Sequence, residues 1–172
     1  QPRPLLVVVP RHPQRFDDVA AMAQQAGFSV ARRSSWTDEP PAVAMHSDVW
    51  LGDSMGEMPL YYALADVALL GGSFAALGGQ NLIEAAACGC PLLMGMHTFN
   101  FEEAAQLAVD AGAAARMKDM ASAVRRAVAL VDDPQRNEWV EQALAFGITH
   151  RGANERMAQR IAMLLTGLDS GR

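Results

Sequence analysis

The chain alternates between apolar runs and segments in which apolar residues recur at helical spacing. Residues 5–9 form a continuous apolar run. Such a run, without alternation, is typical of a strand covered on both faces in a parallel sheet, so we predict a central strand here. Residues 13–25 have a proline in the opening turn, apolar residues at helical spacing and Gly27 as a stop signal, which together predict a helix.

The same alternation continues to residue 117. The pattern predicts further strands at 28–32, 49–51, 67–70, 91–94 and 113–117, further helices at 58–64, 80–88 and 101–110, and a polar loop at 34–47. Strands and helices that take turns indicate βαβ units, and hence a Rossmann-like α/β fold in which a parallel sheet is flanked by helices. From residue 121 onward three helices follow without a strand, broken at 133–134 and 150–152. We expect one domain over residues 1–172, with a helical tail at about 119–168.

The composition narrows the class of protein. With 172 residues, 51% of them hydrophobic, the chain can bury one core. Its 14 basic and 19 acidic residues give a net charge of −5, which argues against a protein that binds a nucleic acid backbone. Cys88 and Cys90 lack the second pair of ligands that a zinc site needs, so we interpret them as core thiols of a reduced compartment.

The sequence shows no membrane or export signal. There is no apolar run of about 20 residues and no signal peptide, so we expect this piece to be soluble by itself. The chain begins at Gln1, without a methionine, and enters its first strand almost at once. We therefore expect a domain excised from a longer protein.

A glycine-rich turn lies between the strand at 67–70 and the helix at 80–88. It contains Gly71, Gly72 and Ser73 at one end and Gly78 and Gly79 at the other. Backbone N–H groups at such a helix start attract anions, so the layout is that of a phosphate or nucleotide cradle. Its spacing matches neither the dinucleotide fingerprint nor the Walker phosphate loop.

Two polar residues follow the glycine turn on the predicted helix. Asn81 and Glu84 are three residues apart and therefore project from the same face. A carboxylate at the position of Glu84 can accept hydrogen bonds from both hydroxyls of a ribose. The alternative is a glutamate that is stabilised by the helix dipole and needs no ligand.

In an open parallel sheet, ligands bind outside the carboxyl ends of the strands. This rule selects four loops: 11–12, 52–57, 71–81 and 95–100. Arg11 is placed to bind an anion, because a guanidinium makes paired hydrogen bonds to phosphate; the alternative is a surface arginine paired with a nearby acid. His12 either orients a sugar or caps the loop.

Loop 52–57 connects a strand to a helix. Gly56 permits a tight turn, and Glu57 is either a ligand-binding residue or a charge that stabilises the helix start. Asp53 is interpreted as a turn residue. The methionines of the chain, Met55 and Met96 among them, are interpreted as gap fillers in the core.

Loop 95–100 precedes the predicted helix at 101–110. Asn100, with Glu103 three residues later, predicts an N-cap with a partial capping box. His97 lies on the predicted ligand side of the sheet, but a lone histidine is more often structural than catalytic.

Several motifs together resemble one family. They lie at 9–16, 52–58, 72–84 and 94–101, in the order in which the family has them, and a tail motif lies at 150–153. The chain resembles the C-terminal half of the Kdo transferases, glycosyltransferases that move 3-deoxy-manno-octulosonic acid (Kdo) from its CMP ester onto a lipid A precursor. The resemblance extends over nearly the whole chain.

The resemblance implies the donor-binding half of a GT-B glycosyltransferase, with CMP-Kdo as donor and a lipid A precursor as acceptor. It assigns the donor phosphate and sugar to Arg11, His12, Ser73, Gly78 and Gly79, and the ribose and nucleobase to Gly56, Glu57, Met58, Asn81 and Glu84. The family inverts the anomeric centre without a metal or other cofactor. Its general base belongs to an N-terminal domain that this chain lacks, so we expect the chain to bind nucleotide without turning over.

The full family members act at the cytoplasmic face of the bacterial inner membrane. For the tail, the arginines at 151, 156 and 160 are interpreted as a solvated helix face rather than a membrane-facing patch.

The chain departs from the family pattern at two places. Met96 stands where many members have proline, and residues 74–77 contain no basic side chain, which argues against an extra charge contact to the donor. Two other hypotheses stay open: a GT-B domain that uses a UDP-sugar, and a non-catalytic Rossmann-like binding module whose glycine turn serves packing alone.

Overall fold

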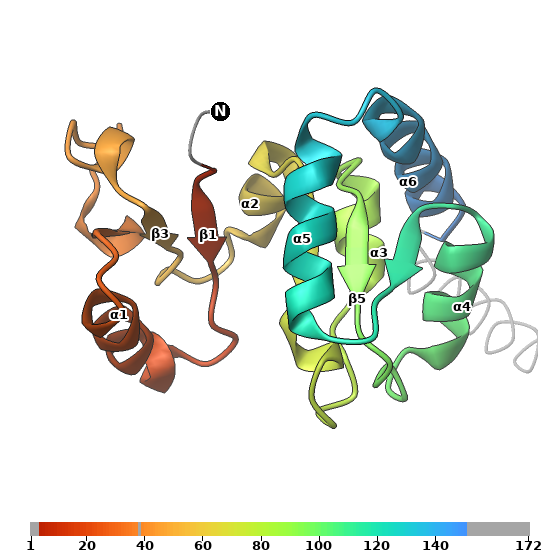
Figure 1. The fold of residues 1–172 in the computed structure, drawn as a ribbon, viewed down its shortest axis with the longest axis horizontal. Helices are drawn as coiled ribbons and strands as arrows, with labels where there is room; N and C mark the ends of the chain where they lie inside the picture. The colour runs from red at the N-terminus through yellow and green to blue at the C-terminus, as the bar shows by residue number, and fades with distance from the viewer. Residues whose placement is uncertain (1–3, 38, 151–172) are drawn as a thin grey trace, which may run out of the picture. The chain divides into compact units, whose positions relative to one another are not determined.

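The computed structural model describes residues 4–37 and 39–150 (Figure 1). Contacts along the chain group into two compact units, Gln1–Tyr61 and Tyr62–Arg172. Each unit has its own three-stranded parallel sheet. The expectation of one domain over residues 1–172 stays a prediction.

The first unit places its strands in the order β1-β3-β2. Its elements are β1 (Leu6–Val8), η1 (Pro13–Arg15), α1 (Phe16–Gln25), β2 (Val30–Arg32), η2 (Arg33–Ser35), η3 (Ala44–His46) and β3 (Val49–Leu51). All pairings are parallel: Val49 lies opposite both Leu6 and Val30. The central strand β3 is the best buried, with Leu51 fully enclosed.

The position of β1 corrects one prediction. Residues 5–9 were expected to form a central strand, but β1 is an edge strand of its sheet, and Leu6 remains 51% exposed. An unbroken apolar run predicts that the faces of a strand are covered, whereas the number of hydrogen-bonded neighbours depends on the strand order.

The second unit places its strands in the order β4-β5-β6. The boundary between the units falls within α2 (Met58–Leu64), and the elements that follow are β4 (Ala68–Leu70), η4 (Gly71–Ser73), α3 (Leu82–Ala87), β5 (Leu92–Met94), α4 (Glu102–Asp110), β6 (Ala114–Arg116), α5 (Met120–Val131) and α6 (Arg136–His150). Successive residues of a strand point to opposite faces. All three residues of β5 are fully buried, so helices cover both faces of this sheet.

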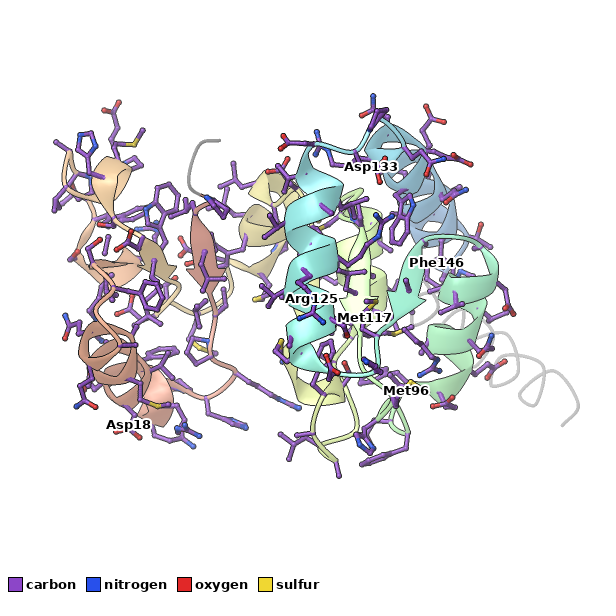
Figure 2. All side chains as sticks on the ribbon, viewed as in Figure 1. Asp18, Met96, Met117, Arg125, Asp133 and Phe146 are labelled. Carbon is purple, nitrogen blue, oxygen red and sulfur yellow. The ribbon has the colours of Figure 1, made fainter. Side chains whose placement is uncertain are left out.

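Helix α3 is held by α6. Among the described elements, these two helices make the most extensive contact, and Phe146 of α6 lies in the core of the second unit (Figure 2). The approach is close enough that a Cβ added at Gly147 would lie 2.5 Å from Cα of Ala87. Glycine at this position and the alanines of α3 therefore allow the two backbones to approach.

The alternation predicted from the sequence is confirmed. Each predicted strand and helix between residues 5 and 117 is present, with ends that differ by a few residues, and every strand pairing is parallel. Two helices of the predicted tail are α5 and α6. The third, with the arginines at 151, 156 and 160 and most of the motif at 150–153, lies outside the described residues.

Candidate functional site

The predicted site residues divide between the two units. The residues of loops 11–12 and 52–57 belong to the first unit. The residues of the glycine turn and of α3 belong to the second unit.

Arg11 and His12 lie in the loop between β1 and η1, and both are exposed. His12 is the N-cap residue of η1; its carbonyl oxygen accepts a hydrogen bond from the Arg15 N–H at 2.9 Å, and its ring makes no capping bond. Within residues 4–37 and 39–150, the Arg11 guanidinium makes no ion pair or hydrogen bond. The Arg11 guanidinium is thus a charged hydrogen-bond donor that has no partner among the described residues.

The loop after β3 is anchored by Asp53, which the sequence suggested was only a turn residue. Its side chain is buried and accepts hydrogen bonds from Arg32 Nε at 2.6 Å, Ser34 Oγ at 2.6 Å and Ser34 N–H at 2.7 Å. Arg32 also pairs with Asp17 at 2.7 Å. Burial opposes ionisation of Asp53, but the bonds from Ser34 and Arg32 outweigh it and lower the pKa of this carboxyl below its ordinary value.

Sequence reasoning missed this anchor although a signal was present. Arg32 ends β2 and Asp53 follows β3, and these two strands are parallel neighbours. The carboxyl ends of parallel neighbours meet at one edge of a sheet. Opposite charges at two such ends predict an ion pair across the edge.

Glu57, at the end of the same loop, has three protein partners. Its Oε1 accepts from Arg33 Nη2 at 2.7 Å, and its Oε2 accepts from the Ser54 hydroxyl and, at 3.3 Å, from the Tyr61 hydroxyl. The hydrogen bond from Ser54 is the main cause that lowers the pKa of Glu57, and Arg33 and Tyr61 add to it. Gly56 before it adopts φ +81°, the left-handed conformation that favours glycine. Met58 begins α2.

In the second unit, Ser73 is held by two hydrogen bonds within the fold. Its side chain is fully buried; the hydroxyl donates to the Leu70 carbonyl at 2.6 Å and accepts from the Gly95 N–H at 2.7 Å. A hydroxyl has a single hydrogen to donate, and here it is used within the fold. Ser73 therefore links the loops after β4 and β5, and its predicted place near the donor phosphate stays a prediction.

The glycines of the turn allow its loop to lie against the loop after β5. Gly78 and Gly79 have φ near +80°, and a Cβ at Gly78 would lie 2.2 Å from Nδ2 of Asn100. The Asn100 N–H donates to the Gly78 carbonyl at 3.2 Å. Packing and backbone conformation both require glycine at position 78, whereas at Gly79 only the left-handed backbone conformation favours it. The contacts place the backbone of the turn beside residues 97–100.

Asn100 itself is not a helix cap. Helix α4 begins at Glu102, its N-cap residue is Phe101, and no side chain caps it. The predicted N-cap at Asn100 is therefore wrong, because the loop continues one residue further and Asn100 turns toward the glycine turn. His97 is exposed, and its backbone N–H donates to the Ser73 carbonyl at 3.0 Å.

Asn81 and Glu84 lie at the start of α3. Asn81 is the N-cap residue, and its side chain accepts from the Ile83 N–H at 3.1 Å. Glu84 is half-buried, and in the described part of the chain its carboxylate makes no hydrogen bond or ion pair. Burial raises the pKa of Tyr62 to about 12, with a smaller contribution from the nearby Glu84 charge. Of the two residues, Glu84 retains free acceptors while Asn81 is used as a cap.

A second cluster that the sequence did not reveal holds the loop after β5. Thr98, which is 3% exposed, donates its hydroxyl to Glu102 Oε2 at 2.6 Å and accepts from Arg116 Nη1 at 2.9 Å. Arg116 also pairs with Glu102 Oε1 at 2.9 Å. Arg116 ends β6, the parallel neighbour of β5, so the same rule of adjacent strand ends predicts this contact.

The methionine prediction is partly wrong. Met94 is fully buried, but Met55 and Met96 are 71% and 60% exposed; Met96 lies in the loop after β5 (Figure 2). Both follow strand ends, where loops are exposed even when their residues are apolar.

Among the described residues there is no group of three or more histidine, cysteine or acidic side chains arranged to hold a metal ion. Within the same residues, none of the helices has the length and hydrophobicity needed to cross a membrane.

Comparison with known proteins identifies relatives along almost the whole chain. A 3-deoxy-D-manno-octulosonic acid transferase of Bordetella pertussis is 54% identical over 156 residues, which cover 90% of this chain and 36% of the relative. The transferase of the same name from Haemophilus influenzae is 39% identical over 158 residues, covering 91% of this chain and 36% of the relative. The chain thus spans about a third of the length of these relatives. No family model matches it.

One solved structure covers most of the fold. The C-terminal CMP-Kdo binding domain of WaaA from Acinetobacter baumannii aligns with 83% of this chain and 72% of its own, at 33% identity and a TM-score of 0.74. This match confirms the Rossmann-like parallel α/β fold class expected for the C-terminal half of a GT-B enzyme. Together with the sequence relatives it confirms the resemblance carried by the motifs. The chain therefore belongs to the 3-deoxy-D-manno-octulosonic acid transferase family, in which it corresponds to a C-terminal domain.

Proposed function

We propose that this chain is the donor-binding domain of a Kdo transferase and that its ligand is CMP-Kdo. The observation that carries the proposal is the similarity, in sequence and in fold, to a domain described as binding CMP-Kdo. The alternative donor, a UDP-sugar, has no comparable support.

Two side chains support the proposal by their lack of protein partners. Arg11 offers an exposed guanidinium after β1, and Glu84 offers a carboxylate on the first turn of α3; in the described residues neither is hydrogen-bonded or ion-paired. An arginine fork suits a phosphate, and a carboxylate suits the two hydroxyls of a ribose. We assign the donor phosphate to Arg11 and the ribose to Glu84.

The remaining assignments follow from the same proposal. His12 and the backbone of Gly78 and Gly79 would line the phosphate and sugar, and the loop of Gly56, Glu57 and Met58 would receive the nucleobase. Asn81 would support the ribose site by capping the helix that carries Glu84.

For the whole protein, we propose transfer of Kdo to a lipid A precursor at the cytoplasmic face of the inner membrane. The acceptor and the general base would belong to the part of the relatives that this chain does not cover. We expect no metal or other cofactor in the donor site, and no transfer by the 172-residue chain alone.

Thermal unfolding with CMP, UMP and NAD tests the proposal. A ligand at about 100 times its dissociation constant adds roughly 2.7 kcal/mol of stability, or about 5–10 °C for a chain of this size. We expect this shift with CMP alone, and its loss in Arg11→Ala and Glu84→Ala. Arg15→Ala and Glu103→Ala, which change exposed charges in the same two units, serve as matched controls and retain the shift. A shift with UMP instead would favour the UDP-sugar hypothesis, and no shift with any nucleotide would refute donor binding by this chain.

A further inference from the structure

We propose that Arg33 is a positioning residue for the nucleobase: it holds the Glu57 carboxylate, and with it the Gly56 turn, in the conformation that receives the base. The inference rests on the proposed function, because it deepens the role given there to the 52–57 loop. It assigns a task to an arginine that lies outside every motif of the family resemblance.

The Glu57 carboxylate is surrounded by donors of the protein itself. Arg33 occupies Oε1 at 2.7 Å, while Ser54 and Tyr61 share Oε2. The Arg33 and Glu57 side chains are 25% and 26% exposed, so the pair is shielded more than an ordinary surface ion pair. The Ser54 and Tyr61 hydroxyls are also within 3.1 Å of one another, which closes the cluster.

Arg33 also contacts an aromatic side chain. Its guanidinium lies 5.6 Å from the ring centroid of Trp36, within the range of a cation–π contact. Trp36 packs edge-on against Trp50 of β3 at 4.9 Å between centroids, and the Trp50 indole N–H donates to the Ala44 carbonyl at 2.8 Å. A chain of contacts thus runs from the central strand of the first sheet through Arg33 to Glu57.

This arrangement bears on how the base is recognised. Cytosine differs from uracil by an exocyclic amine, and a carboxylate that accepts from this amine would select cytosine directly. A carboxylate has about four acceptor sites, and three protein donors already use Glu57. We infer that Glu57 fixes the loop and that backbone groups around Gly56 read the base.

The loop needs such a fixture because its turn is built on glycine. Gly56 has φ +81°, and a Cβ placed there would meet nothing within 4 Å, so neighbouring side chains do not confine it. Glycine also has the greatest conformational freedom of any residue. Glu57 directly follows it, and its carboxylate connects the turn to Arg33 and Tyr61 of the same unit.

A charge exchange across the pair tests the inference. Four proteins are compared: the unchanged chain, Arg33→Gln, Glu57→Arg, and the double variant that carries Arg33→Glu and Glu57→Arg. CMP and UMP binding to each protein is measured by calorimetric titration, and the thermal unfolding of each protein is measured without nucleotide. We expect each single variant to bind CMP about tenfold more weakly, with a smaller CMP-to-UMP preference, and the double variant to recover to within about threefold. Arg15→Gln is the matched control: it removes an exposed arginine paired with Asp18 and is expected to bind CMP normally.

The outcomes separate the possibilities. If Glu57 reads the base directly, Arg33→Gln frees the Glu57 carboxylate and retains CMP binding. The double variant then does not bind CMP, because the arginine at position 57 cannot accept a hydrogen bond from the cytosine amine. Either result overturns the inference. Absence of CMP binding by the unchanged chain would overturn the proposed function together with this inference. If the Arg33 variants unfold too readily to titrate, Tyr61→Phe decides: a two- to threefold weaker affinity supports positioning, and unchanged affinity refutes it.

Discussion

Ser73→Ala probes the link between the loops after β4 and β5. The substitution removes a hydroxyl that is fully buried and leaves the Gly95 N–H without its acceptor and the Leu70 carbonyl without this donor. An unsatisfied buried donor costs about 1–3 kcal/mol and the loss of a second bond about 1 kcal/mol more. We therefore expect the free energy of unfolding to fall by about 2–4 kcal/mol, which corresponds to a melting temperature lower by roughly 5–15 °C.

The assay is urea and thermal unfolding in the absence of nucleotide, followed by circular dichroism. Ser35→Ala is the matched control: its hydroxyl also donates to a backbone carbonyl, that of Arg32 at 2.7 Å, but the residue is exposed, so we expect a loss below about 1 kcal/mol. If the Ser73 hydroxyl served only to bind ligand, its removal would leave the stability of the nucleotide-free protein unchanged. Stability of Ser73→Ala within about 0.5 kcal/mol of the unchanged chain would refute the link.

Three further substitutions test other parts of the chain. Asp53→Asn is expected to lower the free energy of unfolding by about 2–3 kcal/mol at neutral pH. Because folding lowers the pKa of Asp53, the difference in stability between the two proteins should narrow as the pH falls below about 4. A difference in stability that does not change with pH in urea titrations would contradict this prediction. Gly147→Ala should destabilise by about 1–3 kcal/mol in the same assay, since the new Cβ meets the Ala87 backbone, although helix propensity alone predicts a gain of about 1 kcal/mol. Burial raises the pKa of the Cys90 thiol to about 12. In a Cys88→Ser background, we therefore expect iodoacetamide at pH 8 to alkylate Cys90 only after denaturant is added. Rapid labelling of the folded protein, measured by mass spectrometry, would refute this prediction.

The order of elements was predictable because it depends on local patterns. Apolar runs, helical spacing and stop signals gave the alternation of strands and helices up to β6, and the parallel pairing follows from that alternation. The place of β1 at a sheet edge was not predictable, because strand order depends on contacts between segments far apart in the sequence.

Within the candidate site, the sequence predicted the place of residues in loops better than it predicted their contacts. Ser73 and Asn100 were recognised as loop residues, but the direction of their side chains depends on how two loops pack, which leaves no periodic signal. Asp53 and Arg116 illustrate the opposite case: each forms an ion pair or hydrogen bond across neighbouring strand ends, and their charge and position would have sufficed to expect it.

Helix α3 has only six residues, so the contact with α6 has a consequence for the integrity of the proposed ribose site. A helix of this length is not stable in water without packing partners, because its first turn is costly to nucleate. The segment that carries Glu84 therefore folds and frays together with a helix more than fifty residues further along the chain. Changes on the face of α6 that meets α3, and any shortening of the chain into Arg136–His150, should weaken nucleotide binding without altering a single residue that touches the ligand.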